Sequence, residues 1–197
     1  MQANQARRSA GFTLIELLMV VGIIAILALI ALPNFLDAQM RAKVSRAKSD
    51  MRTIATALET YCVDNNRYVP NYDAGPYFPQ PNTEYQTYAA LTSPVPYISS
   101  APKDPFAPNI EAPERGDFFE YYADDSVQAD PTYTEPTRSY WANTGTRWLV
   151  SSIAPDRKLQ NLGRQLQNIA PLLYDASNGT VSPGEIGRSN IVASLPH

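Results

Sequence analysis

The hydrophobic positions at the start of the chain form one long uninterrupted run. Between residues 12 and 32 only Thr13 and Glu16 are polar. A helix of this length covers roughly 31 Å at ~1.5 Å per residue, which is about the hydrocarbon thickness of a bilayer. Arg7 and Arg8 precede the run, and no acidic residue does. Because positive charges favour the cytoplasmic side of a span, the pattern predicts a membrane helix whose N-terminus is cytoplasmic.

Three hypotheses explain this apolar run. A secretory signal peptide has a shorter apolar region of about 7–15 residues, followed by small residues at a cleavage site. A single-pass anchor fits the length, but it leaves Glu16 unexplained, because a carboxylate in hydrocarbon is costly and usually has a functional partner. The third hypothesis is a span that is processed on its cytoplasmic side.

Beyond Pro33 the apolar positions follow a helical period. They recur every three or four residues and form one stripe, while most charged residues occupy the other faces. The stripe comprises Leu36, Met40, Val44, Ala47, Met51, Ile54, Leu58 and Tyr61. The turn-forming "DNNRY" and then Pro70 end the pattern. We therefore expect one helix from about Phe12 to about Asn65, kinked or loosened at Pro33 because proline lacks an amide donor.

The remainder of the chain predicts short strands separated by loops. Residues 69–113 are rich in Pro, Tyr and Asn, which favours an ordered loop with short strands. Runs with aromatic and β-branched residues predict strands within residues 117–124, 138–144 and 146–155. The sequence "NTGT" at 143–146 indicates a hairpin turn. Residues 157–175 predict a short helix, and residues 175–190 a loop with a final short strand. The predicted class is α+β, with the long N-terminal helix packed on a small antiparallel sheet with long Pro/Tyr-rich loops.

Composition argues against several classes of function. The formal net charge is −3, so no basic surface suggests binding to nucleic acid. The only histidine is His197, which disfavours His-based triads and metal clusters. Cys62 is the only cysteine, so an intrachain disulfide is impossible, and its place near the apolar stripe favours a small buried side chain. Nothing fixes the separation of the acids at 124, 125 and 130, so a hydrolase pair there is disfavoured.

The segment "GFTLIELLMVVGIIAILALIALPNF" resembles the class III signal of type IV pilins and type II secretion pseudopilins. Basic residues precede Gly11, Phe12 follows it, Glu16 is the fifth residue after the glycine, and Pro33 is the twenty-second. The resemblance implies that prepilin peptidase cuts after Gly11 and methylates the new amine of Phe12. Glu16 would then pair with the Phe12 amine of another subunit and set the register of assembly. The alternative is that Glu16 merely lies at headgroup level.

Three further segments are similar to major (G-type) pseudopilins. They are "YCVDNNRYVP" at 61–70, "KDPF" at 103–106 with Phe and then Ala where the family has Trp and Gly, and "WLVSSIAPD" at 148–156. The absence of a C-terminal disulfide loop also favours a pseudopilin over an adhesive pilin. The resemblance implies a leader at residues 1–11, a transmembrane and filament-core helix at 12–33, and a periplasmic pilin-like domain at 34–197.

The function implied by this resemblance is structural, not enzymatic. The subunit would polymerise with itself into a helical filament that assists protein export across the outer membrane. Its other expected partners are prepilin peptidase, an inner-membrane assembly platform and minor pseudopilins. It would cross the bacterial inner membrane once. Two alternatives remain: a type IV pilin of a surface fibre for adhesion, motility or DNA uptake, and a sensor or enzyme that uses the signal only as an anchor.

The resemblance also raises the question of a structural calcium ion. Major pseudopilins commonly bind one calcium ion in their C-terminal loops, and calcium requires several oxygen ligands. The candidates are Asp156, Asp175, Asn178 and Glu185. However, the family's Gly-rich acidic run is not recognisable, the basic residues after Asp156 oppose a cation, and "DASNG" is typical of a surface turn. The turn is the simpler interpretation.

Overall fold

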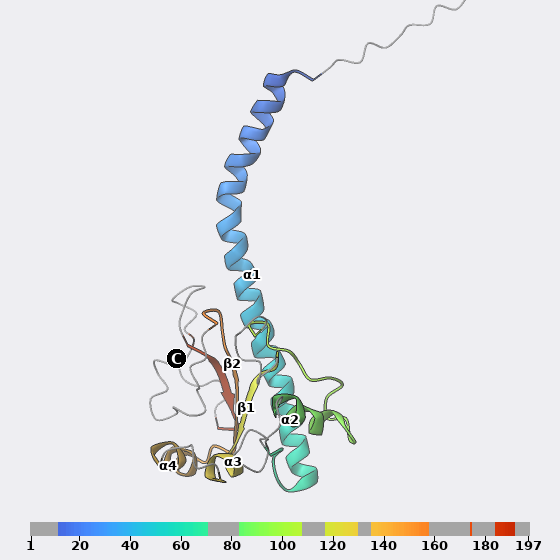
Figure 1. The fold of residues 1–197 in the computed structure, drawn as a ribbon, viewed down its shortest axis with the longest axis vertical. Helices are drawn as coiled ribbons and strands as arrows, with labels where there is room; N and C mark the ends of the chain where they lie inside the picture. The colour runs from blue at the N-terminus through green and yellow to red at the C-terminus, as the bar shows by residue number, and fades with distance from the viewer. Residues whose placement is uncertain are drawn as a thin grey trace, which may run out of the picture. The chain divides into compact units, whose positions relative to one another are not determined.

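The computed structural model describes residues 12–70, 83–107, 117–129, 135–157, 174 and 184–191. The chain divides into two compact units, Met1–Gln39 and Met40–His197. Helix α1, Leu14–Asn65, contributes to both units (Figure 1). The prediction of one long N-terminal helix ending at about Asn65 is therefore confirmed.

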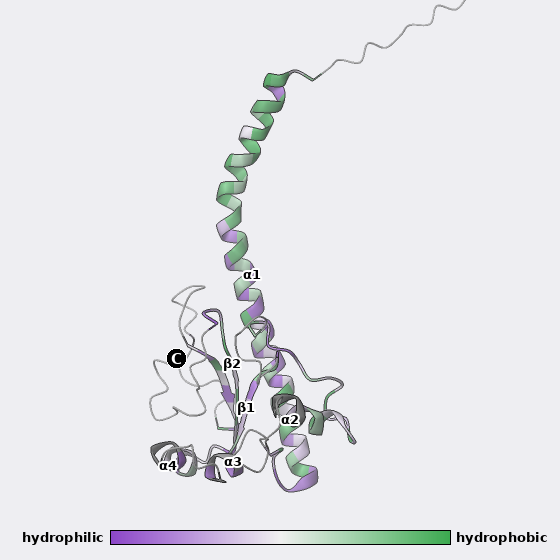
Figure 2. Cartoon of the chain, viewed as in Figure 1, coloured by the Kyte–Doolittle hydropathy of each residue, from purple (hydrophilic) through white to green (hydrophobic). Residues whose placement is uncertain are grey.

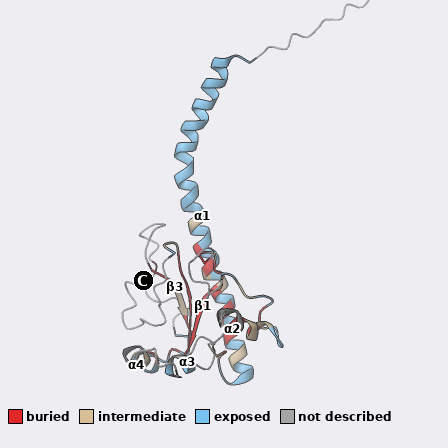
Figure 3. Ribbon diagram, viewed as in Figure 1, coloured by how far each residue is buried: buried red, intermediate tan, exposed pale blue. Residues whose placement is uncertain are grey.

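The N-terminal part of α1 is apolar and has no cover from its own chain. Every residue from Phe12 to Gln39 is exposed (Figure 3). The colouring by hydropathy is mostly hydrophobic over the N-terminal half of α1 (Figure 2). By length and composition, α1 is long and apolar enough to cross a membrane. The helix passes through Pro33 without a break. Beside it, the Asn34 side chain donates a hydrogen bond from Nδ2 to the Ile30 carbonyl oxygen at 3.2 Å.

The second unit contains a three-stranded antiparallel sheet. Its strands are β1, Glu120–Ala123, β2, Trp148–Ser152, and β3, Ile186–Ser189, in the spatial order β1-β2-β3. Tyr121 pairs with Val150, which in turn pairs with Arg188. All residues of β1 and β2 are buried, so both faces of these strands are covered. The expected strands at 117–124 and 146–155 and the final short strand are confirmed, as is the α+β class.

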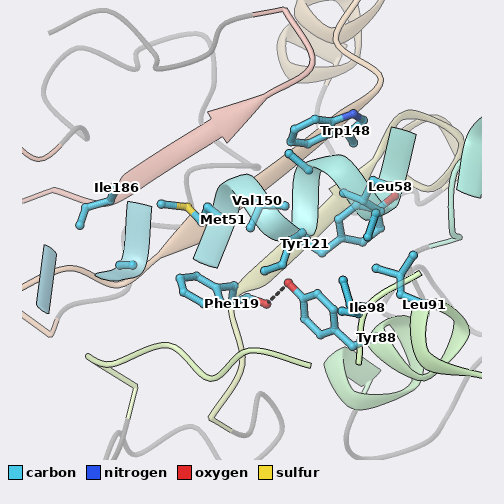
Figure 4. Close-up of a cluster of buried hydrophobic side chains, with 14 of the residues drawn as sticks. Met51, Leu58, Tyr88, Leu91, Ile98, Phe119, Tyr121, Trp148, Val150 and Ile186 are labelled. Atoms are coloured by element: carbon cyan, nitrogen blue, oxygen red, sulfur yellow. Dashed lines mark hydrogen bonds between the residues drawn. The ribbon is translucent and has the colours of Figure 1, made fainter. Parts of the chain in front are cut away.

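The amphipathic stripe of α1 packs on this sheet. Val44, Ala47, Met51, Ile54 and Leu58 are all buried, and together with strand residues they form the hydrophobic core (Figure 4). The sheet contributes residues from all three strands to this core: Tyr121 and Ala123 of β1, Trp148 and Val150 of β2, and Ile186 of β3. Burying each large aliphatic side chain contributes about 1.5–3 kcal/mol. At its ends the stripe is less covered: Met40 and Tyr61 are partly buried, and Leu36 is exposed.

Three further helices were not expected from the sequence. They are α2, Thr83–Thr92, α3, Asp124–Ala129, and α4, Glu135–Thr144. Helix α2 lies in the segment predicted to be a loop with short strands, and its Tyr88 side chain is buried and donates a hydrogen bond from its hydroxyl to the Phe119 carbonyl at 3.1 Å (Figure 4). The predicted helix within residues 157–175 lies outside the described residues.

The strand predicted at 138–144 and the hairpin turn at 143–146 are wrong. Residues 138–144 belong to α4, and Gly145 follows this helix with a φ of 70°. A glycine in the left-handed region commonly ends a helix, and a proline is tolerated in the first helical turn. Pro136 and Gly145 therefore mark the ends of α4, and these local signals outweigh the aromatic content that suggested a strand.

A buried carboxylate connects the loop before β1 to the end of β2. Asp104 is fully buried, and its Oδ1 accepts hydrogen bonds from the Phe106 amide at 2.9 Å and the Ser152 hydroxyl at 2.8 Å. Its Oδ2 accepts a hydrogen bond from the Ile153 amide at 3.1 Å. Buried charges are tolerated when such donors surround them. The "KDPF" segment thus holds the chain where β2 ends.

Candidate processing and assembly site

The start of α1 is organised around Glu16. Phe12 and Thr13 precede the helix, which begins at Leu14. The Glu16 carboxylate accepts two hydrogen bonds at Oε2, from the Thr13 amide at 2.9 Å and from the Thr13 hydroxyl at 2.6 Å. In return, the Glu16 amide lies 3.4 Å from the Thr13 hydroxyl oxygen, to which it donates. This reciprocal arrangement is a capping box, which satisfies amide groups that have no partner within the helix.

The capping box gives Glu16 a role within a single chain. A helix cap contributes about 0.5–2 kcal/mol, and a negative charge near the helix N-terminus is additionally favourable. The spacing Thr-x-x-Glu is the sequence signal of a capping box. Glu16 was assigned from the sequence to pairing between subunits, and this cap was not predicted.

The same carboxylate retains capacity for another partner. An ionised carboxylate accepts about four hydrogen bonds, and among the described residues both bonds to Glu16 end on Oε2. Oε1 is thus available to an amine from a second chain while Oε2 keeps the helix cap. Phe12, the residue whose amine cleavage would create, is 74% exposed. Gly11, on the other side of the predicted cleavage point, lies outside the described residues.

The surface around this site is a continuous apolar cylinder. The exposed large hydrophobic side chains run from Phe12 to Leu36 and point in every direction around the helix. Soluble monomers rarely expose an apolar surface of this extent, because it is unfavourable in water. The segment therefore requires either lipid or other apolar helices around it.

A second polar group that the sequence gave no reason to single out is Glu59. Its Oε1 accepts a hydrogen bond from the Trp148 indole at 2.7 Å, and its Oε2 accepts one from the Tyr68 hydroxyl at 3.0 Å. Burial, reinforced by this bond to Glu59, raises the pKa of Tyr68 well above its ordinary value. Glu59 itself is exposed and lies at an open groove of about 530 Å³, which Thr56 and Thr60 also line.

The calcium candidates are only partly placed. Asp156 lies half-buried in a turn in which Ala154 and Arg157 have positive φ values of 64° and 55°. Glu185 is buried, and its main-chain carbonyl accepts a hydrogen bond from the Tyr174 amide at 2.9 Å. Asp175 and Asn178 lie outside the described residues. Within the described part of the chain, no three His, Cys, Asp or Glu side chains are grouped as metal ligands would be. The calcium ion stays a prediction.

Two other residues considered in the sequence, Cys62 and Asp124, are placed by the structure. Cys62 is a free thiol of intermediate exposure, so it is less buried than expected. Asp124 begins α3 and forms an ion pair with Arg147 at 3.1 Å, and the Gln128 amide lies 3.4 Å from its other oxygen. The exposed Asp125 is its neighbour, and residue 130 lies outside the described residues.

Two family models match the chain. Residues 6–32 match the prokaryotic N-terminal methylation motif, and residues 34–130 match type II secretion system protein G. The first match includes the segment with the capping box. The second begins directly after Pro33, and its range includes the second half of α1 and all of α2, β1 and α3. No solved structure matches the chain significantly.

Several curated relatives extend this similarity. The type II secretion system core protein G of Aeromonas hydrophila is 31% identical over 125 residues, covering 58% of this chain and 79% of that protein. The corresponding protein of Vibrio cholerae is 32% identical over 121 residues, covering 58% of this chain and 77% of its own. The type IV major pilin protein PilA of Myxococcus xanthus is 49% identical, but only over 61 residues, which cover 31% of this chain and 28% of the pilin.

Proposed function

Because the chain belongs to the type II secretion system protein G family, we propose that it is a structural subunit of a pseudopilus, a helical filament that assists protein export across the outer membrane. The observation that carries this proposal is the extent of the similarity. The protein G relatives of Aeromonas hydrophila and Vibrio cholerae align over more than three quarters of their own length, and these alignments reach well into the second unit. The pilin match is confined to a much shorter stretch, so it favours the alternative of a surface fibre less strongly.

We propose that prepilin peptidase removes residues 1–11 and methylates the amine of Phe12. The methylation motif matched over residues 6–32 supports this proposal, and so does the non-helical conformation of Phe12 and Thr13, because a protease requires an accessible backbone. Before cleavage, Arg7 and Arg8 hold the N-terminus in the cytoplasm. The second unit would then lie in the periplasm, with the apolar part of α1 in the inner membrane.

Assembly would exchange one apolar environment for another. In the membrane, lipid covers the exposed apolar surface of residues 12–36, and in the filament the same surfaces of neighbouring copies replace the lipid. The Phe12 amine and the Glu16 carboxylate are both costly in such a core unless they are paired. Because Glu16 Oε1 is available while Oε2 caps the helix, the Phe12 amine of a neighbouring copy can bind there. This pairing favours one axial offset between copies.

The remaining partners follow from the same proposal. Extraction from the membrane requires an assembly platform in the inner membrane, and minor pseudopilins would join the same filament. Pro33 would take part in assembly by allowing α1 to adjust between its membrane and filament environments, because the carbonyl four residues before it lacks a helical donor. The protein would contribute a surface and a register and would catalyse no reaction.

Replacement of Glu16 tests the proposal. Glu16→Ala should leave insertion and cleavage intact, because loss of a charge makes a span easier to insert. It should sharply reduce filament yield, measured by shearing and sedimentation against processed monomer in the membrane. Glu16→Gln keeps the shape without the charge and should have a partial defect. Intact mass of wild-type filaments should correspond to a chain that starts at methylated Phe12.

Two results would contradict the proposal. Normal filament yield and normal secretion with Glu16→Ala would remove the pairing from the mechanism. Filaments found on the surface of intact cells, with secretion unaffected by deletion of the protein, would favour the type IV pilin alternative.

A further inference from the structure

Charge is unevenly distributed along the mature chain. Residues 37–52 contain five basic and two acidic residues, a net charge of +3. Residues 53–197 contain nine basic and sixteen acidic residues, a net charge of −7. The middle of α1 is therefore a basic segment within an otherwise acidic protein. Such a division favours contact between the basic part of one copy and the acidic part of another.

The basic segment carries a row of cations on one flank of α1. Arg41, Lys48 and Arg52 are separated by seven and four residues, which places them within about 20° of a common line along a helix of 3.6 residues per turn. Arg41 and Arg52 are exposed, and Lys48 is half-buried. Among the described residues no carboxylate lies within 4.0 Å of these three side chains, whereas Arg46, on another face, pairs with Asp50 at 3.6 Å.

The row continues into an acidic residue. Glu59 follows Arg52 by seven residues and lies on the same line of the helix. No described basic side chain lies within 4.0 Å of its carboxylate. Its two oxygens each accept one hydrogen bond, from Trp148 and from Tyr68. Because a carboxylate accepts about four, each oxygen retains room for a further donor.

We propose that this cation row binds a second copy of the chain in the filament, with Arg52 of one copy opposite Glu59 of the next. This inference rests on the proposed function, since it requires parallel copies side by side. In parallel copies, a displacement of seven residues brings Glu59 level with the neighbour's Arg52, and seven residues of helix correspond to about 10.5 Å.

The displacement agrees in sense and size with the contact at the N-terminus. When Glu16 of one copy pairs with the Phe12 amine of its neighbour, residue 16 of the first copy lies level with residue 12 of the second. In the proposed contact, residue 59 of the first copy lies level with residue 52 of the second, so the displacement has the same direction. That contact requires a displacement of roughly 6–10 Å, because Phe12 and Thr13 precede the helix and extended residues advance further than helical ones. Long Arg and Glu side chains can span the small remaining difference. One stagger therefore satisfies both contacts.

A membrane surface fits the row less well. The row extends over eleven residues, about 16.5 Å of helix. The headgroup layer on one side of a bilayer is only about 5–8 Å thick. Anionic lipids would therefore reach one end of the row and leave the other in water, unless the helix lay flat on the surface.

The experiment compares two full-length double variants with the same change in net charge. Arg41→Glu with Arg52→Glu reverses two charges of the row, and Lys43→Glu with Arg67→Glu reverses two exposed charges outside it. We expect the row variant to lose at least tenfold in sedimentable filament, with processed monomer in the membrane unchanged. The control should stay within twofold of wild type. Equal yields from the two variants would overturn the inference.

A double-mutant cycle tests the named contact. Arg52→Gln and Glu59→Gln each remove one charge and keep hydrogen-bonding groups, so folding should persist. If the residues meet across copies, the double variant should form filaments no worse than either single variant. Arg52→Gln combined with Asp125→Asn, which removes an exposed acid elsewhere, should show independent effects. Independent effects in the Arg52–Glu59 pair would overturn the contact. Absence of filaments from the wild-type chain would overturn the proposed function as well.

Discussion

Asp104→Asn should destabilise the second unit, because the side chain is fully buried and three donors from the described residues converge on it. If the new amide places its oxygen at the position of Oδ1, it still accepts hydrogen bonds from Phe106 and Ser152. Its NH2 group then faces the Ile153 amide, which donated to Oδ2 at 3.1 Å. Two buried donors meet there without an acceptor, and each costs about 1–3 kcal/mol. We expect a loss of roughly 2–4 kcal/mol.

This loss is large relative to the total stability of a domain, which is about 5–15 kcal/mol. For a domain of this size, each kcal/mol lowers the melting temperature by about 2–4 °C. Asp104→Asn should therefore lower it by roughly 5–15 °C. Asp104→Ala should lower it further, because Phe106, Ser152 and Ile153 would each lose this acceptor. Ser152→Ala should have the smallest effect, because the Phe106 and Ile153 amides keep the carboxylate as their acceptor, and only the long 3.4 Å bond from the Ala154 amide to the Ser152 hydroxyl is lost in addition.

The assay is thermal unfolding of residues 37–197, followed by far-UV circular dichroism. Asp125→Asn is the control, because Asp125 is exposed, and it should melt with the wild type. A melting temperature for Asp104→Asn within about 2 °C of the wild type would refute the argument. That result would mean that water or a rearranged loop satisfies the donors.

Three other predictions concern the same unit. Gly145→Ala should cost about 1 kcal/mol through backbone strain alone, measured by thermal melting, because its φ is 70° and an added Cβ meets no atom within 4 Å. Burial raises the pKa of Tyr68 and Tyr121 above 10.0, so their contribution to stability is complete below about pH 10 and is lost as the pH rises further. The melting temperature should therefore fall between pH 8 and pH 11. It should fall less in the Tyr68→Phe variant, which has no hydroxyl to ionise at this position. If a calcium ion binds at Asp156 or Glu185, chelation should lower the melting temperature, whereas an unchanged value would favour the surface turn.

Elements with a long or clear period were predictable from sequence. The apolar stripe from Val44 to Leu58 keeps a helical period over several turns, so it indicates a helix and not a strand. Helix α1 ends at Asn65, within the predicted turn "DNNRY". The strands β1 and β2 were predicted because aromatic and β-branched residues are concentrated there. Helix α4 was mispredicted because Tyr140 and Trp141 have the same composition signal, while the helix-end signals at Pro136 and Gly145 received too little weight.

Parts of the site depend on contacts that no local pattern specifies. Thr13 and Glu16 are three residues apart, so their capping box could have been found from spacing alone. Glu59 and Trp148 are 89 residues apart, and their hydrogen bond exists only because α1 packs on the sheet. No periodicity connects two such positions. The same is true of Asp104 and Ser152, which are 48 residues apart.

Because of where the two tryptophans lie, the intrinsic fluorescence of the chain reports on the second unit. Trp141 and Trp148 are the only tryptophans, and both are almost completely buried in the second unit. The Trp148 indole also donates to Glu59 on α1, so its emission should change when the helix separates from the sheet. Tryptophan fluorescence therefore follows the state of the second unit and does not report on the apolar segment at residues 12–36, which contains no tryptophan. Unfolding of this unit can be followed without a label while the same chain is held in detergent, in a bilayer or in a filament.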